Sequence, residues 1–162
     1  MARLYTTGFE IPNYRYPFTG TNGAFNSAVK RTGSYSFSIS GGVLGRLTAP
    51  MTIGGTRAEL FVRFAWRCSN AADNSDLFMI STNVTADCVR IYKSNGFFGL
   101  RIGSNYYPGS QTAIVHDTWY LIELHVKLHD TEGVAELLID GRSEVLVEGD
   151  TKPSTDSYYT TA

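Results

Sequence analysis

Apolar and polar residues alternate most regularly between Trp119 and Gly149. A period of two predicts strands with one buried face and one solvated face. Two short segments with turn residues, Asp130–Gly133 and Asp140-Gly141, divide the region into three antiparallel strands. The buried face is made of Tyr120, Ile122, Leu124, Val126, Leu128, Ala135, Leu137, Ile139, Val145 and Val147.

The pairing of these strands can be predicted, because a slip of one residue would move every apolar side chain to the wrong face. With position 129 opposite 134, Lys127 lies opposite Glu136, an ion pair that contributes about 0.2–1 kcal/mol. With 139 opposite 143, a three-residue loop of Asp, Gly and Arg joins the second and third strands.

Shorter runs of the same kind recur through the chain. We predict strands at 3–9, 34–40, 43–49, 59–69, 76–82, 88–94 and 97–104, with a loop between the first two. Asn95-Gly96 is the turn dipeptide typical of a two-residue hairpin. No segment has a period of 3.6, so we expect no helix beyond a turn or two. Residues 1–152 are predicted to form a single domain, and 153–162 a loosely held tail.

The fold class expected from these strands is all-β, a two-sheet antiparallel sandwich. A chain of 162 residues with ten Tyr, nine Phe and 16 Gly is typical of such a fold. The expected core residues are Tyr35, Phe37, Ile39, Val62, Phe64, Trp66, Phe98, Leu100, Ile122, Leu124, Val126, Leu137 and Ile139.

Charge and hydropathy exclude several classes of partner. The net charge is −1, so no overall field favours nucleic acid or an anionic membrane. No run approaches the roughly 18 apolar residues of a membrane helix. The first residues carry no apolar run of the signal-peptide type, so we expect a soluble chain that is not exported by the general secretory route.

The order of the elements resembles a known family. It runs through Gly8-Phe9-Glu10, residues 31–40, a central meander, Trp119 opening a strand, and Asp140-Gly141 closing the next. This order is similar to the laminin-G-like branch of the concanavalin A-like jelly rolls, over roughly residues 5–152, and the two ends look most like phage versions. The resemblance implies a jelly-roll sandwich and a phage virion protein.

One departure from the family concerns the end of the chain. Members usually continue with another strand or two beside the first strand, whereas this sequence ends at Ala162. Two explanations stay open: residues 153–162 supply a short substitute, or another subunit covers an open sheet edge.

Catalytic motifs are not found. Polysaccharide-cleaving jelly rolls share a Glu-x-Asp-x-x-Glu strand that places two carboxylates for hydrolysis, and this sequence has none. Glu144, Glu148 and Asp150 are interpreted as solvated surface acids. No serine has the Gly-x-Ser-x-Gly context of a nucleophile. We therefore expect no enzymatic activity.

Metal and disulfide chemistry are also not expected. His125 and His129 lie about 13 Å apart on a strand, too far to share an ion, and these two and His116 are interpreted as surface histidines. Many laminin-G-like modules bind calcium through loop acids. Because Asp73, Asp76, Asp87 and Asp117 are loop acids here, a calcium ion is the alternative to the expectation of no cofactor. In a meander of 60–68, 77–82 and 88–93, Cys68 faces inward and Cys88 outward at opposite ends, which predicts free thiols.

A patch of arginines with aromatic residues is the main candidate site, and the alternative interpretation is a solvated sheet face with scattered charges. If strands 59–69, 88–94 and 97–104 are neighbours, their outward faces bring together Phe61, Arg63, Arg67, Arg90, Tyr92 and Arg101. The loop 105–109, with Tyr106 and Tyr107, is a second candidate site. Arginine and tyrosine are enriched at interface hot spots, and exposed tyrosines serve both sugar stacking and protein docking.

Two functions follow as expectations. The first is a non-enzymatic phage virion protein, a head decoration or tail-associated component that docks on other virion proteins and is made in the bacterial host cytoplasm. It is expected to be capsid-bound or a homo-oligomer. The second is a lectin-like module that binds a cell-surface glycan. Neither involves nucleic acid or membrane.

Overall fold

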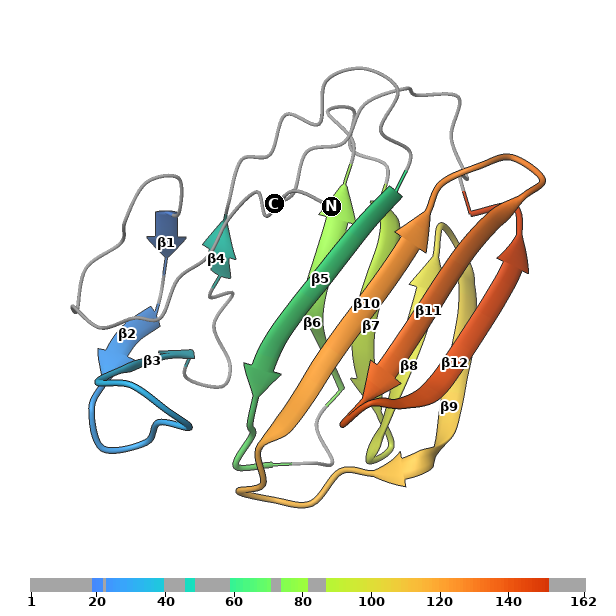
Figure 1. Ribbon diagram of the computed structural model, residues 1–162. Helices are drawn as coiled ribbons and strands as arrows, with labels where there is room; N and C mark the ends of the chain where they lie inside the picture. Colours follow the sequence, from blue (N-terminus) through green and yellow to red (C-terminus); the bar gives the residue numbers. More distant parts are fainter. Residues whose placement is uncertain are drawn as a thin grey trace. The chain divides into compact units, whose positions relative to one another are not determined.

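The computed structural model describes residues 19–21, 23–39, 46–48, 59–70, 74–81 and 87–151. Its strands divide into two compact units, one with β1 to β4 and one with β5 to β12 (Figure 1). The described ranges contain no helix, which confirms the all-β prediction. Accordingly, no helix in this part of the chain could cross a membrane.

The larger unit is a sandwich of two antiparallel four-stranded sheets (Figure 1). One sheet has the order β12-β11-β10-β5 and the other has the order β6-β7-β8-β9. The strands are β5 (Glu59–Trp66), β6 (Ser75–Ser81), β7 (Asp87–Ser94), β8 (Phe97–Ile102), β9 (Asn105–Ala113), β10 (Tyr120–Lys127), β11 (Gly133–Ile139) and β12 (Arg142–Gly149).

The core lies between these two sheets. Every second residue of β10 and of β11 is buried, as the sequence alternation predicts. Seven of the expected core residues are fully buried: Phe98, Leu100, Ile122, Leu124, Val126, Leu137 and Ile139. Val62, Phe64 and Trp66 of β5 pack against them and are partly buried. Each fully buried apolar side chain contributes about 1.5–3 kcal/mol relative to exposure.

The smaller unit consists of two short strand pairs. β1 (Thr19–Thr21) pairs with β4 (Arg46–Thr48), and β2 (Gly23–Asn26) pairs with β3 (Ser36–Ile39). The predicted strands at 34–40 and 43–49 are therefore present in part. The prediction of a loop between 9 and 34 is wrong for β1 and β2, whose short glycine-containing sequences carry no clear alternation. The predicted strand at 3–9 lies outside the described residues.

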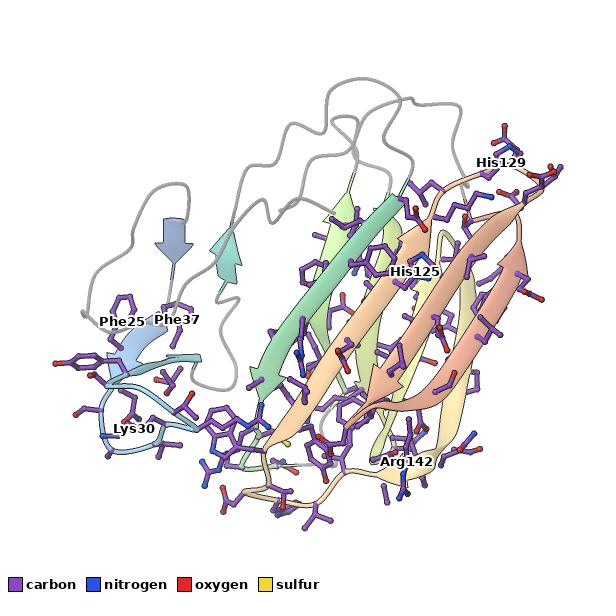
Figure 2. The ribbon with its side chains drawn as sticks, viewed as in Figure 1. Phe25, Lys30, Phe37, His125, His129 and Arg142 are labelled. Atoms are coloured by element: carbon purple, nitrogen blue, oxygen red, sulfur yellow. The ribbon has the colours of Figure 1, made fainter. Side chains whose placement is uncertain are left out.

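Aromatic packing holds β2 on β3. Phe37 lies opposite Phe25, with ring centroids 5.8 Å apart, and its ring also covers Gly23 (Figure 2). The expected position of Tyr35, Phe37 and Ile39 between the two large sheets stays a prediction.

The register of β10 and β11 differs from the predicted one by two residues. Lys127 lies opposite Val134, and His125 lies opposite Glu136. The predicted Lys127–Glu136 pair is therefore wrong, and Glu132 in the turn is the acid that Lys127 approaches, at 4.0 Å. A shift of two keeps every side chain on its face. The alternation alone could not distinguish the two registers.

The β11–β12 hairpin contains a bulge. Leu137 lies opposite Val145, but beyond the bulge Leu138 lies opposite Ser143 and Ile139 opposite Arg142. The loop is thus the two residues Asp140 and Gly141, both with positive φ (51° and 80°), and the predicted three-residue loop is wrong. Positive φ at both positions is the geometry of a type I′ turn, whose twist suits a hairpin. The bulge leaves Glu144 as the extra residue of β12.

β5 pairs with β10 and not with β6. The predicted meander of 60–68, 77–82 and 88–93 is therefore wrong at its first strand, because the chain crosses between the sheets after Trp66. The Asn95-Gly96 hairpin between β7 and β8 is confirmed, with φ of 51° and 80°. Residues 105–113, interpreted as a tyrosine-rich loop at their start, form β9.

Candidate binding faces

The sandwich presents two outer faces, and the predicted arginine patch is divided between them. We call the outward side of β6 to β9 the tyrosine face. One cross-strand row on it is formed by Met79, Arg90, Arg101 and Tyr106. Neighbouring positions in a row lie about 4.8 Å apart. Arg90, Tyr92 and Arg101 therefore come together as predicted, and Tyr106, predicted as part of a separate candidate loop, joins them. Arg63 and Arg67 belong to the other sheet or its end.

A glycine allows the two tyrosines of this face to meet. Tyr92 on β7 and Tyr106 on β9 are two strands apart, yet their ring centroids are separated by only 5.4 Å. The strand between them carries Gly99 opposite Tyr92, and a Cβ at Gly99 would lie 2.5 Å from the Tyr92 ring carbon Cζ. The Tyr92 ring therefore lies over the backbone of β8 and is buried, while Tyr106 is 60% exposed.

The arginines of the tyrosine face are held in different ways. Arg90 forms an ion pair with Asp76 of β6. Arg101 donates from Nε to the carbonyl of Gly103 at 2.8 Å, and its Cζ lies 5.1 Å from the Tyr106 ring centroid. A guanidinium in that position is attracted by the electron-rich ring face. Arg101 and Tyr106 thus fix each other's orientation at the surface.

Burial, and to a lesser extent the nearby Tyr106, raises the pKa of Tyr92. The native state then holds the phenolic proton more tightly than the unfolded chain does. This contribution to stability is fully present below the ordinary tyrosine pKa of about 10 and is lost as the pH rises through the folded value. We expect Tyr92→Phe to lose less stability than the parent chain between about pH 9 and pH 12, measured by urea unfolding. Equal losses would contradict the expectation.

The outward side of β5, β10, β11 and β12, which we call the glutamate face, combines acids with exposed apolar residues. One row contains Phe61, His125, Glu136 and Leu146, and Phe61 and Leu146 are 49% and 55% exposed. Phe61 stacks on His125 with centroids 4.2 Å apart, and His125 Nε2 contacts Glu59 at 2.8 Å. Outward carboxylates come from all four strands: Glu59, Glu123, Glu136 and Glu148.

Arg63 and Arg67 are occupied by ion pairs. Arg63 on the glutamate face contacts Glu123 at 3.3 Å. Arg67, just beyond β5, contacts the carboxylate of Asp117 at 2.7 Å and its carbonyl at 3.0 Å. Exposed pairs of this kind contribute about 0–1 kcal/mol. They reduce the positive charge that either arginine offers to a partner.

Two residues that were expected at the surface point toward the interior. Tyr107 is partly buried and packs against the core, so it is no part of an exposed face. Glu144, interpreted as a surface acid, is buried, because the β12 bulge turns it toward β9. Its two carboxylate oxygens accept hydrogen bonds from the backbone N–H groups of Gln111 (2.9 Å) and Thr112 (3.0 Å). Glu148 and Asp150 are exposed, as expected.

Lys93, which the sequence reading did not single out, is buried at one end of the sandwich. Its Nζ donates to the carbonyl of Asn70 at 2.5 Å. Lys93 shares the inward side of β7 with Val89 and Ile91, so alternation alone could have identified it. Cys68 nearby is a free thiol, as predicted, and burial raises its pKa. The side chain of Cys88 lies outside the described residues.

The histidines of β10 and its turn have structural contacts. His129 Nδ1 accepts hydrogen bonds from the backbone N–H groups of Thr131 (3.1 Å) and Glu132 (2.8 Å), which closes the turn before β11 (Figure 2). Among the described residues, no three His, Cys, Asp or Glu side chains lie close enough to hold a metal ion.

Comparison of the chain with protein-family models, curated proteins and solved structures finds no match.

Proposed function

We propose that this chain is a non-enzymatic structural component of a phage particle, a head decoration or tail-associated protein that docks on other virion proteins. The resemblance of its strand order to phage jelly rolls of the concanavalin A-like type supports this assignment. The observation that carries the proposal is the glutamate face, where Phe61 and Leu146 lie exposed in one row of the sheet.

The chemistry of the glutamate face indicates what it would dock on. Half-buried Leu121, Val134 and Leu138 extend the apolar surface beside Leu146. The same face carries four glutamates and two cations, Arg63 and Lys127, so negative charge predominates on it. Complementary charge steers association and sets the register of an interface. The docking partner would therefore present an apolar patch bordered by lysine or arginine.

The expected test is loss of particle association when the glutamate face is altered. Phe61→Glu combined with Leu146→Glu should reduce the amount of chain that cosediments with particles by at least about tenfold, because apolar anchors dominate interface energies. Val115→Glu is the matched control, since Val115 is also exposed (57%) but lies in the loop after β9. Unchanged cosedimentation of the double variant, or equal loss in the control, would refute docking through this face.

The C-terminal segment needs a separate variant. Residues 153–162 were the predicted tail, and Thr151, just before it, is fully buried and hydrogen-bonded to Lys127 and His129. A deletion that tests assembly without harming the fold should therefore remove only residues 152–162. Loss of particle association with an unchanged melting temperature would assign docking to that segment as well.

The absence of enzymatic activity is part of the same proposal. Among the described acids, Glu144 is committed to two backbone N–H groups. Release of reducing sugars from a polysaccharide by the purified chain, abolished by changing Glu144, Glu148 or Asp150, would overturn it.

A second candidate function is glycan binding at a cell surface, and the tyrosine face favours it. Tyr106 is the most exposed large apolar side chain described, and it is held by Tyr92 and Arg101. A particle protein that docks through one sheet could present the other sheet to a host cell.

A further inference from the structure

The tyrosine face carries an exposed aromatic ring whose position is already fixed. Tyr106 makes a T-shaped contact with Tyr92, at 77° between ring planes, and is contacted by the guanidinium of Arg101. Both partners are held in turn, Tyr92 by Gly99 below it and Arg101 by the Gly103 carbonyl. A ligand that binds here orders few side chains, so little conformational entropy opposes binding.

The charge of this face is concentrated on Arg101. Arg90, its neighbour in the row, is compensated by the carboxylate of Asp76. Arg101 uses Nε for Gly103, and within the described ranges its Nη groups make no hydrogen bond. A guanidinium presents its N–H groups in a planar fork that matches a carboxylate. Arg101 therefore offers an uncompensated anion-binding group beside an exposed ring.

We propose that the tyrosine face binds an acidic pyranose, the uronic-acid unit of a polysaccharide. The apolar C–H face of the sugar ring stacks on Tyr106, because the electron-rich ring face attracts its C–H groups. The sugar carboxylate accepts hydrogen bonds from the Nη groups of Arg101, and such charge-assisted bonds are roughly twice as strong as neutral ones. Tyr92 holds Tyr106 in place.

This ligand fits the site better than other anions do. A nucleic acid would need a row of uncompensated cations, whereas the ion pair of Arg90 leaves Arg101 as the main positive charge. An acidic peptide would use Arg101 but has no flat ring of C–H groups to cover Tyr106. The inference extends the second candidate function and names its ligand. It uses the opposite sheet from the docking proposal, so each can fail without the other.

The test is titration of the full chain with three probes that differ in charge and in the presence of a sugar ring. The probes are trigalacturonic acid, its fully methyl-esterified and therefore neutral form, and a pentaglutamate peptide. Binding is measured by NMR and by calorimetry. We expect submillimolar binding of the acid, at least about tenfold weaker binding of the ester and of the peptide, and weakening as salt increases.

Variants assign the binding to residues. Arg101→Gln and Tyr106→Ala should each weaken binding of the acid by at least about tenfold. Gly99→Ala should weaken it too, because a Cβ there displaces the Tyr92 ring. Arg142→Gln is the matched control, since Arg142 is an exposed arginine at the start of β12 in the other sheet (Figure 2), and it should bind like the parent. Melting temperatures of Arg101→Gln and Tyr106→Ala close to that of the parent would confirm that the fold is intact.

Three results would overturn the proposal. The first is no binding of the acid at millimolar concentration. The second is equal binding of the acid and the pentaglutamate peptide, which would indicate a simple anion site. The third is equal loss of binding in Arg142→Gln and Arg101→Gln, which would indicate attraction to net charge alone. None of these results would alter the expected cosedimentation of the glutamate-face variants.

Discussion

Replacing Glu144 by Ala is expected to destabilise the sandwich by about 3 kcal/mol. The carboxylate accepts the N–H groups of Gln111 and Thr112, in a segment where β9 is irregular and its register against β8 shifts. Both donors are partly buried, and a donor that loses its partner in such a site costs up to about 1–3 kcal/mol. For a chain of this length the expected fall in melting temperature is about 10 °C, measurable by circular dichroism.

Two further variants separate this role from a general effect of losing a charge. Glu144→Gln should have an intermediate effect, because its amide keeps one acceptor oxygen but turns an NH₂ toward the second backbone donor. Glu148→Gln, at an exposed position of the same strand, should change stability by less than about 0.5 kcal/mol. A Glu144→Ala variant as stable as Glu148→Gln would show that the bulge has no such role.

Thr151→Val is expected to destabilise the chain by about 2–3 kcal/mol, although the two side chains have the same shape. The buried Thr151 hydroxyl donates to the carbonyl of Lys127 (2.7 Å) and accepts from the N–H of His129 (3.2 Å). The Thr151 N–H also donates to the His129 carbonyl at 3.1 Å. Valine would leave the Lys127 carbonyl and the His129 N–H without the hydroxyl as their partner at this buried position.

The control for this variant is Thr151→Ser, which keeps the hydroxyl and removes only a methyl group. We expect Thr151→Ser to lose about 1 kcal/mol, so that urea unfolding midpoints should order as parent, Ser, Val. A valine variant more stable than the serine variant would show that packing, and not the hydroxyl, secures the end of β12. Gly133 must also stay small here, because a Cβ would lie 2.6 Å from the carbonyl oxygen of Gly149.

Local patterns were sufficient to predict most of the strands. β10, β11 and β12 follow from period-two alternation, and the two sharp turns follow from Asn95-Gly96 and Asp140-Gly141, where positive φ is required. β9 was missed, because Asn105-Tyr-Tyr-Pro-Gly109 carries turn residues and no clean alternation. Its strand conformation depends on pairing with β8 and on the carboxylate of Glu144.

The candidate site could be predicted only in part. Arg90, Tyr92 and Arg101 were placed together correctly because β7 and β8 form a hairpin, a local feature. Arg63 was assigned to the same face because β5 was expected beside β6, whereas it pairs with β10 about 60 residues further along the chain. Sequence periodicity gives the face of each strand, but it contains no information on which distant strand becomes its neighbour.

The sequence by itself determined that this chain forms antiparallel strands, which residues of β10 and β11 enter the core, and where two of the hairpins turn. Tertiary structure alone decided the β5–β10 pairing, the division of the arginines between two faces, and the burial of Glu144. The physical reason is that side-chain direction repeats every two residues along a strand, whereas bulges and long-range pairings depend on the neighbouring strand. One extra residue in β12 turned a predicted surface acid into a buried hydrogen-bond acceptor between the sheets.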